Sequence, residues 1–176
     1  MEVFVPNNFA PANPIRIPAS KSIAQRAILA AALSAQNSKI HFPGKSDDVL
    51  HLIGIARSLG CVVLEAENQL EIQPNTQARK TRFDAGESGL AARLLLPVLA
   101  AIGGRFELVG KGSLLSRPMT QIIELLRQAG IDIQSVNEHV PIQLEGKLKG
   151  GAFKIDGSWS SQHVSGLLMA LPLCAE

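Results

Sequence analysis

Three short stretches of the sequence place hydroxyl, amide and cationic side chains where a helix is expected to begin. They are Ser20-Lys21-Ser22 followed by Arg26, Glu87-Ser88-Gly89 followed by Arg93, and Ser160-Ser161-Gln162. Arg26 comes four residues after Ser22, about one helical turn, so the two side chains share one face of the helix. A helix N-terminus carries roughly half a positive charge and unpaired N–H groups, both of which attract anions. Together the three stretches predict a site for a phosphate or a carboxylate.

A more ordinary interpretation of each stretch remains open. Serine is a common N-cap residue, and a serine of the first stretch would then only begin a helix while Lys21 and Arg26 stay solvated. The recurrence of the pattern at three equivalent positions favours the anion site. A further cation, Arg117, stands just before Pro118, where it either reaches into a cleft or faces solvent.

The chain contains an internal repeat. Residues 55–63 match residues 125–133 at an offset of 70, and in both a helical pattern ends at glycine before a β-rich run. The segments that precede the three helix starts recur at offsets of 66 and 72 residues. Periodicity between these landmarks predicts an α/β fold of repeated strand–helix–strand–helix–strand–strand units (βαβαββ), two complete and a third only begun.

The expected elements follow from these periods. The first unit has a strand at 13–17, a helix at 21–35, a strand at 38–42, a helix at 46–59 and strands at 61–65 and 69–73. The second has a strand at 80–84, a helix at 87–102, a strand at 105–109, a helix at 117–129 and strands at 131–135 and 140–144. The third begins with a strand at 151–155 and a helix at 160–173, and the chain then stops, which is typical of a truncated chain.

Composition excludes several classes of protein. Lys and Arg number 17 against 15 Asp and Glu, a net charge of +2, and the aromatic residues are six Phe and one Trp. A nucleic-acid-binding protein usually needs a basic stripe, often with stacking rings, so nucleic acid is not an expected partner. At 46% apolar and 18% charged residues the chain is too hydrophobic to be disordered. Its longest apolar stretches cover about half a membrane span and no secretory signal opens the chain, so we expect a cytoplasmic protein without a membrane partner.

Other chemistries lack the residues they need. The glycine-rich stretch at 104–113 departs from a phosphate-binding P-loop in its spacing, and no Ser-x-x-Lys pair supports a penicillin-binding type of serine enzyme. The basic run at 79–82 is expected to be a solvated loop. Neither a metal nor another cofactor is expected, because metal-ligand and disulfide spacings are missing from the histidines and cysteines, which are His41, His51, His139, His163, Cys61 and Cys174.

Four motifs, in order along the chain, resemble the 5-enolpyruvylshikimate-3-phosphate (EPSP) synthase family. Residues 18–27 resemble its opening signature, and residues 86–93 resemble its Gly-Asn-x-Gly-Thr-x-x-Arg segment. Residues 117–119 and 157–162 resemble two more motifs. Four motifs in the right order make a specific match over essentially the whole chain.

The resemblance implies both a fold and a reaction. By this resemblance, the complete protein has two domains of three βαβαββ units each, with the active site between the domains. The match covers a little under half of a typical member of the family. Residues 1–16 would then belong with the other domain, and residues 17–176 would form part of a substrate-binding domain, with units at 17–79, 80–150 and 151–176. The implied enzyme is a 3-phosphoshikimate 1-carboxyvinyltransferase of the shikimate pathway. It transfers the enolpyruvyl group of phosphoenolpyruvate to the 5-hydroxyl of 3-phosphoshikimate and releases phosphate.

The resemblance also implies roles for single residues. Lys21 is the catalytic candidate, which contacts both substrates and transfers a proton. The residues implied for 3-phosphoshikimate are Lys21, Ser22, Arg26, Ser160, Ser161 and Gln162. Those implied for phosphoenolpyruvate are Lys21, Gly89, Arg117 and Gln162. The family's acid and base carboxylates lie in the half that this chain does not contain, so the chain is expected to be inactive by itself.

The sequence departs from the family's motif at two positions, and two alternative functions remain open. Glu87 and Leu90 stand where the family usually has Asn and Thr, which leaves the role of their loop in binding phosphoenolpyruvate open. UDP-N-acetylglucosamine 1-carboxyvinyltransferase shares the fold and the donor, although Ser20-Lys21-Ser22 with Arg26 favours 3-phosphoshikimate as the acceptor. A non-catalytic phosphate-binding fragment is the other alternative. The complete family member is expected to be a monomer, and this chain is expected to self-associate through the apolar face of its last helix.

Overall fold

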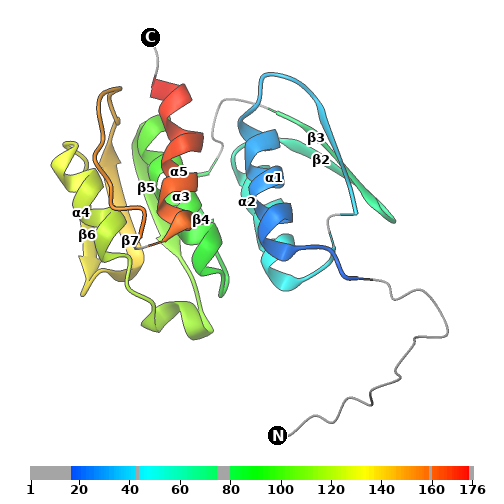
Figure 1. Cartoon of the computed structure of the whole chain (residues 1–176), viewed down its shortest axis with the longest axis horizontal. Coiled ribbons are helices and arrows are strands. Elements are labelled where there is room, and N and C mark those ends of the chain that lie inside the picture. Colours follow the sequence, from blue (N-terminus) through cyan, green and yellow to red (C-terminus); the bar gives the residue numbers. More distant parts are fainter. Residues whose placement is uncertain (1–16, 43, 75–79, 159, 175–176) are drawn as a thin grey trace, which may run out of the picture.

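Two α/β units lie next to each other in the structure, a computed structural model that describes residues 17–42, 44–74, 80–158 and 160–174 (Figure 1). The first contains helices α1 (Lys21–Leu33) and α2 (Asp47–Ser58) and strands β1 (Ser38–His41), β2 (Val62–Ala66) and β3 (Gln69–Gln73). The strands form an antiparallel sheet in the order β1-β3-β2. Leu70 and Ile72 alternate with half-exposed residues along β3, so one face of the sheet packs against the helices.

The second unit has a four-stranded mixed sheet. Its strands are β4 (Arg82–Asp84), β5 (Gly104–Val109), β6 (Asp132–Val136) and β7 (His139–Gly146), in the order β4-β5-β7-β6. The first pair is parallel and the other two pairs are antiparallel. Helix α3 (Gly89–Ile102) connects the parallel strands, and helix α4 (Thr120–Gln128) follows the short 3₁₀ helix η1 (Gly112–Ser116). A parallel pair needs such a crossover, and a helix provides it.

The two units share their strand order and their helix ends. The order β1-β3-β2 in the first unit corresponds to β5-β7-β6 in the second, with antiparallel pairing in both. Gly60 and Gly130, which stand 70 residues apart, both have positive φ just after a helix and donate to the carbonyls of Arg57 and Arg127. The expected end of a helix at glycine is therefore confirmed in both places.

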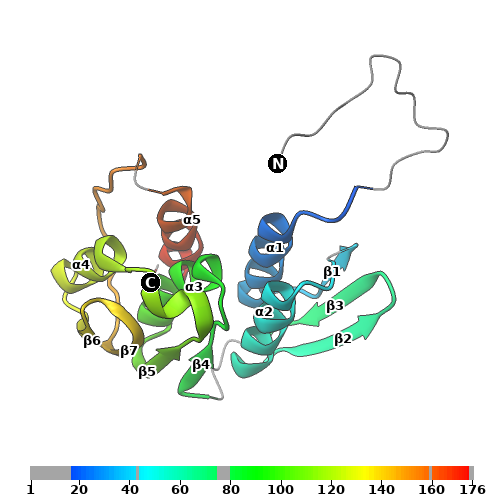
Figure 2. The ribbon, with the colours of Figure 1, turned by 90° about the horizontal axis from the view of Figure 1, so that it is seen from below.

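Helix α3 forms the centre of the core. Nearly all of its residues are buried, because sheet, helices and loops surround it. Helix α5 (Ser161–Ala170) packs along it, and α1 approaches it from the first unit, so that the three helices lie side by side (Figures 1 and 2). The two helices α3 and α5 approach closely at Gly166, where an added Cβ would lie only 2.7 Å from the carbonyl oxygen of Arg93. Pro97 lacks the N–H that would normally bond that carbonyl, so the oxygen faces α5 instead.

One expected element is missing, and one expected helix begins later than predicted. The strand at 151–155 does not form; these residues have no regular structure, and Phe153 and Ile155 pack against the core instead of pairing with another strand. The helix at 117–129 begins only at Thr120, because the residue before a proline avoids the helical conformation, and Arg117 accordingly has φ −96° and ψ 114°. The 3₁₀ helix η1 before it was not expected.

Smaller differences concern the ends of elements. Helix α1 ends at Leu33 rather than at residue 35, and α5 ends at Ala170. After α5 the chain continues as a short 3₁₀ helix, η2 (Leu171–Cys174), since Pro172 cannot donate the next helical hydrogen bond. Of the strand expected at 13–17, residues 13–16 lie outside the described residues, and Ile17 belongs to no strand.

Candidate functional site

The N-termini of three helices open into one cleft of about 1270 Å³, which we call the central cleft. Lys21 and Ser22 of α1, Gly89 of α3 and Gln162 of α5 line it, together with Arg117. The tertiary structure thus brings together helix starts that are more than 60 residues apart in the sequence. Because each start has N–H groups that its own helix leaves unpaired, the convergence favours a bound anion.

The start of α1 presents an exposed cation that is already paired. Ser20 is the N-cap, and its hydroxyl oxygen accepts a hydrogen bond from the N–H of Ile23 at 3.4 Å, which leaves Lys21 and Ser22 exposed beyond it. The Lys21 ammonium lies 2.9 Å from a carboxylate oxygen of Asp48, in the first turn of α2. An anion that binds Lys21 must therefore compete with Asp48.

The start of α3 is joined to α1 by a buried hydrogen bond. Ser88 is its N-cap, and the hydroxyl accepts from the N–H of Ala91 at 3.2 Å and donates to the Gln25 side-chain oxygen at 2.8 Å. Both Ser88 and Gln25 are almost completely buried. Because buried polar groups are costly to leave unpaired, this bond fixes the two helix starts relative to each other.

Gly89 lies where two guanidinium groups meet. An added Cβ there would lie 2.8 Å from Nη1 of Arg93 and 3.2 Å from Nη1 of Arg117, so only glycine leaves the backbone open to these groups. Arg93 donates to the side-chain oxygen of Gln162 at 3.1 Å and to the carbonyl of Pro118 at 3.0 Å. Burial, and then the positive charge of Arg117, lower the pKa of Arg93. An anion beside Gly89 would relieve this crowding of positive charge.

The roles implied by the family resemblance omit Arg93, although Arg93 belongs to the second of the three stretches that predict an anion site. Arg93 follows Gly89 by four residues, as Arg26 follows Ser22, and each guanidinium bonds the carbonyl four residues before it. The repeat itself therefore points to Arg93.

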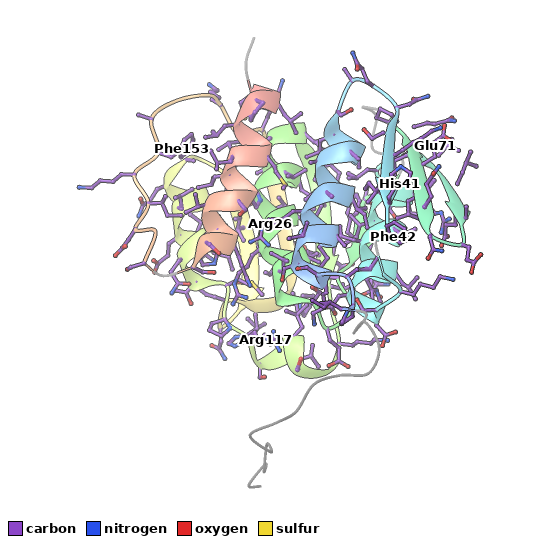
Figure 3. The ribbon with its side chains drawn as sticks, turned by 45° about the vertical axis from the view of Figure 1, so that its right-hand side comes forward. Arg26, His41, Phe42, Glu71, Arg117 and Phe153 are labelled. Carbon is purple, nitrogen blue, oxygen red and sulfur yellow. The ribbon has the colours of Figure 1, made fainter. Side chains whose placement is uncertain are left out.

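Arg26, Ser160 and Ser161 lie beside the central cleft rather than in its lining. Nε of Arg26 donates to the Ser165 hydroxyl at 3.1 Å, and that hydroxyl donates to the carbonyl of Ser161 at 2.8 Å. Ser160 is the N-cap of α5, and its hydroxyl accepts from the N–H of Gln162 at 3.2 Å. These contacts join α1 to α5, and Figure 3 shows Arg26 between the two helices. Of the six residues implied for 3-phosphoshikimate, Lys21, Ser22 and Gln162 line the cleft.

Arg117 projects from the turn that precedes α4. Its Nη2 donates to the hydroxyl of Ser113 at 3.3 Å, and Figure 3 shows its side chain near the end of the molecule that holds η1. The N–H of Ser113 donates to a carboxylate oxygen of Glu87 at 3.1 Å. Hydrogen bonds from Ser113, followed by the charges of Lys111 and Arg117, lower the pKa of Glu87.

Further cations line the central cleft. Lys80 and Arg82 are among them. Lys80 is exposed and belongs to no helix or strand, as expected of a solvated loop, whereas Arg82 lies in β4, so the loop expectation is wrong for Arg82. Arg79 lies outside the described residues. Arg82 belongs to β4, and its Nε lies 2.9 Å from a carboxylate oxygen of Glu107.

Neither a metal cluster nor a membrane span is found in the described part of the chain. There, no three side chains of the His, Cys, Asp and Glu types come close enough together to hold a metal ion. Among the same residues, no helix has the length and apolar character needed to cross a membrane.

Comparisons with known proteins show which family the chain is similar to. The family model for EPSP synthase (3-phosphoshikimate 1-carboxyvinyltransferase) matches residues 12–176. A 3-phosphoshikimate 1-carboxyvinyltransferase from Clostridium beijerinckii is 36% identical over 168 residues, which cover 90% of this chain and 39% of that protein. One from Clostridium perfringens is 34% identical over 165 residues, covering 92% of this chain and 39% of that protein. The chain thus spans about two fifths of the length of the curated relatives it matches.

The fold comparison gives the same result. The solved structure of EPSP synthase from Acinetobacter baumannii superposes with a TM-score of 0.77 at 25% sequence identity. The superposition covers 89% of this chain and 37% of that one. Since the family model, the curated relatives and the solved structure agree over almost all of these residues, the chain belongs to the EPSP synthase (3-phosphoshikimate 1-carboxyvinyltransferase) family.

Proposed function

We propose that this chain supplies one wall of the active site of a 3-phosphoshikimate 1-carboxyvinyltransferase. The complete protein would transfer the enolpyruvyl group of phosphoenolpyruvate to the 5-hydroxyl of 3-phosphoshikimate and release phosphate, within the shikimate pathway. The observation that carries the proposal is the convergence of three helix N-termini, Lys21 and Arg117 on the central cleft. Both substrates are polyanions, and this arrangement is suited to bind phosphates and carboxylates.

The proposed reaction requires particular chemical groups in the site. The acceptor hydroxyl adds to C2 of phosphoenolpyruvate while C3 gains a proton, which forms a tetrahedral intermediate. Loss of a C3 proton and of phosphate then restores the double bond. These steps need a proton donor, a base and charges that hold the phosphates and the carboxylate in place. Lys21 is the residue of this chain that we assign to both substrate contact and proton transfer.

We divide the remaining residues between the two substrates. Gly89, Arg117 and Gln162 are proposed to hold phosphoenolpyruvate, and their support is that Arg117 and Gln162 both lie beside the start of α3. Ser22, Arg26, Ser160, Ser161 and Gln162 are proposed for 3-phosphoshikimate. Three of these lie at the junction of α1 and α5, so their use requires the acceptor to reach the edge of the cleft.

We further propose a place for the chain in the complete protein. Residues 17–176 would be part of a substrate-binding domain, with units at 17–79, 80–150 and 151–176, and residues 1–16 would belong with the other domain. The complete protein would be a monomer, and it would be cytoplasmic because both proposed substrates are small water-soluble metabolites. The chain alone would self-associate, although less of α5 is available than expected: Gly166 and Leu167 pack against α3, while Leu168 is exposed.

Titration calorimetry with each substrate tests the proposed function. The unchanged chain should bind phosphoenolpyruvate and 3-phosphoshikimate, and Lys21→Ala should weaken both. Arg26→Ala should weaken only 3-phosphoshikimate, roughly ten- to a hundredfold, the usual effect of losing a charge-assisted contact. Lys39→Ala is a matched control, because Lys39 is an exposed cation on β1 and does not line the cleft.

Several outcomes would contradict the assignment. Unchanged 3-phosphoshikimate affinity in Arg26→Ala would remove that residue from the site. Binding of UDP-N-acetylglucosamine in place of 3-phosphoshikimate would identify the other enolpyruvyl transferase. Equal binding of inorganic phosphate and of both substrates would indicate a phosphate-binding module without substrate selectivity.

A further inference from the structure

Among the described residues, Glu87 is one of four carboxylates that line the central cleft together with its cations, the others being Asp47, Asp48 and Asp84. Glu87 lines the cleft next to the start of α3, and the positive charges of Lys111 and Arg117 both act on it. A negative charge in a site for anions weakens binding through like-charge repulsion. Glu87 therefore needs a role that offsets this cost.

Glu87 contacts the residues at the start of η1. Its carboxylate accepts a hydrogen bond from the N–H of Ser113 at 3.1 Å. Gly112 packs so closely that a Cβ at that position would overlap the carboxyl group, and its φ is +53°. Lys111, the residue before it, donates its N–H to the carbonyl of Gly86 at 2.8 Å. The carboxylate thus holds the beginning of η1 against the loop that leads into α3.

The other end of η1 carries Arg117. The N–H of Arg117 donates to the carbonyl of Leu114 at 3.1 Å, and its Nη2 donates to the hydroxyl of Ser113 at 3.3 Å. Ser113 is therefore bonded twice, by Glu87 at its backbone and by Arg117 at its side chain. The two bonds connect Glu87 to the guanidinium that lies over Gly89.

We propose that Glu87 is a positioning residue that fixes η1 through Ser113 and thereby directs Arg117 toward the anion bound beside Gly89. The inference rests on the proposed function for the identity of that anion, phosphoenolpyruvate. Geometry and charge act in opposite directions here, because the hydrogen bond orients Arg117 while the negative charge repels the anion. Two substitutions separate these effects.

Calorimetric titration of the chain with phosphoenolpyruvate distinguishes the effect of the hydrogen bond from the effect of the charge. Glu87→Gln keeps an oxygen that accepts from Ser113 and removes the charge, so the affinity should rise, about threefold. Glu87→Ala removes the hydrogen bond as well, so the affinity should fall, about tenfold, despite the lost repulsion. Glu124→Ala is the matched control, an exposed glutamate on α4 outside the cleft, and should leave the affinity unchanged. A rise in both Glu87 variants would overturn the proposal, because charge alone would then explain the effect.

Two measurements without ligand test the positioning directly. Hydrogen exchange at the Ser113 amide should accelerate in Glu87→Ala and stay slow in Glu87→Gln. The NMR signal of the Arg117 Nε–H group, assigned by its loss in Arg117→Lys, should move in Glu87→Ala alone. An unchanged Ser113 exchange rate in Glu87→Ala would overturn the inference even if the chain binds phosphoenolpyruvate. If the expected changes occur and phosphoenolpyruvate does not bind, the positioning role stands and the proposed function fails.

Discussion

At the scale of single residues, we expect the pair formed by Lys21 and Asp48 to limit how strongly the central cleft attracts an anion. The ammonium is 58% exposed and the carboxylate 19% exposed, and they are 2.9 Å apart. An ion pair this open to water contributes little stability, about 0–1 kcal/mol, so breaking it does not threaten the fold. We expect the pair to lower the affinity for an anion instead, because the ligand must displace Asp48 from Lys21.

Replacing Asp48 should therefore strengthen binding. Asp48→Asn is expected to raise the affinity for phosphoenolpyruvate about two- to fivefold, the range of one exposed ion pair, and to weaken its dependence on salt. Calorimetry at two ionic strengths measures both. Asp47→Asn is the matched control, since Asp47 stands next to Asp48, also lines the cleft and carries the same charge. Weaker binding in Asp48→Asn would mean that Asp48 orients Lys21 for the ligand rather than competing with it.

At the scale of elements, the contact between α3 and α5 depends on one glycine. A Cβ on Gly166 would lie 2.7 Å from the backbone oxygen of Arg93 and 2.9 Å from Pro97. Backbone at this distance cannot move aside without shifting a helix. Gly166→Ala should therefore reduce the free energy of unfolding, by about 1–3 kcal/mol, as overpacked cores do.

Gly54 provides the control for this substitution. It lies in the middle of α2, and nothing comes within 4 Å of the place where its Cβ would be. Gly54→Ala should increase the free energy of unfolding by about 0.5–1 kcal/mol, because alanine loses less backbone entropy in a helix. Urea denaturation of both variants measures the difference. Equal effects at the two positions would show that α5 is not packed against α3 as closely as described.

The same face of α5 carries a buried histidine that predicts a pH dependence. His163 is 2% exposed, and neither ring nitrogen has a hydrogen-bond partner in the part of the chain that the structure describes. Burial, and then the charge of Arg93, lower its pKa below the ordinary 6.5. As the pH falls below 6.5 the unfolded chain takes up the proton first, so stability should fall until the pH passes the lowered pKa of the folded state.

Replacement of His163 by an apolar ring should remove that dependence. Between pH 6.5 and 5, His163→Phe should lose less stability than the unchanged chain, by at most about 1.4 kcal/mol per pH unit. Thermal denaturation across this range measures the two slopes, and His41→Phe controls for an exposed histidine. Identical slopes for His163→Phe and the unchanged chain would show that His163 is solvated in the folded state.

At the scale of the whole molecule, the proposed reaction needs charges on both sides of the reacting carbon, and we propose that this chain supplies only one wall of the site. The chain spans about two fifths of the length of its curated relatives. With both substrates saturating, we expect phosphate release at least about a thousandfold slower than by the complete relative from Clostridium beijerinckii. A colorimetric phosphate assay compares the two. Turnover near that of the relative would mean that this wall suffices for catalysis.

Local sequence signals predicted most elements and the start of each key helix. Glycines 60 and 130 end helices because they adopt positive φ, and Ser20, Ser88 and Ser160 begin helices because their hydroxyls accept from free N–H groups. The strand at 151–155 fails for the opposite reason. A strand depends on a partner for its hydrogen bonds, and the composition of a segment does not tell whether a partner is adjacent.

The sequence by itself determined the repeat, the helix starts, the family resemblance and the kinds of groups that bind anions, since all of these depend on residue type and short-range spacing. Only the tertiary structure decided which groups share a cleft. It pairs Lys21 with Asp48, brings Arg93 and Arg117 together over Gly89, and joins Glu87 to Arg117 through Ser113. Apart from the local bond between Ser113 and Arg117, these contacts link segments that are far apart in the sequence or lie on different elements. They therefore depend on how helices and turns pack and not on a local pattern.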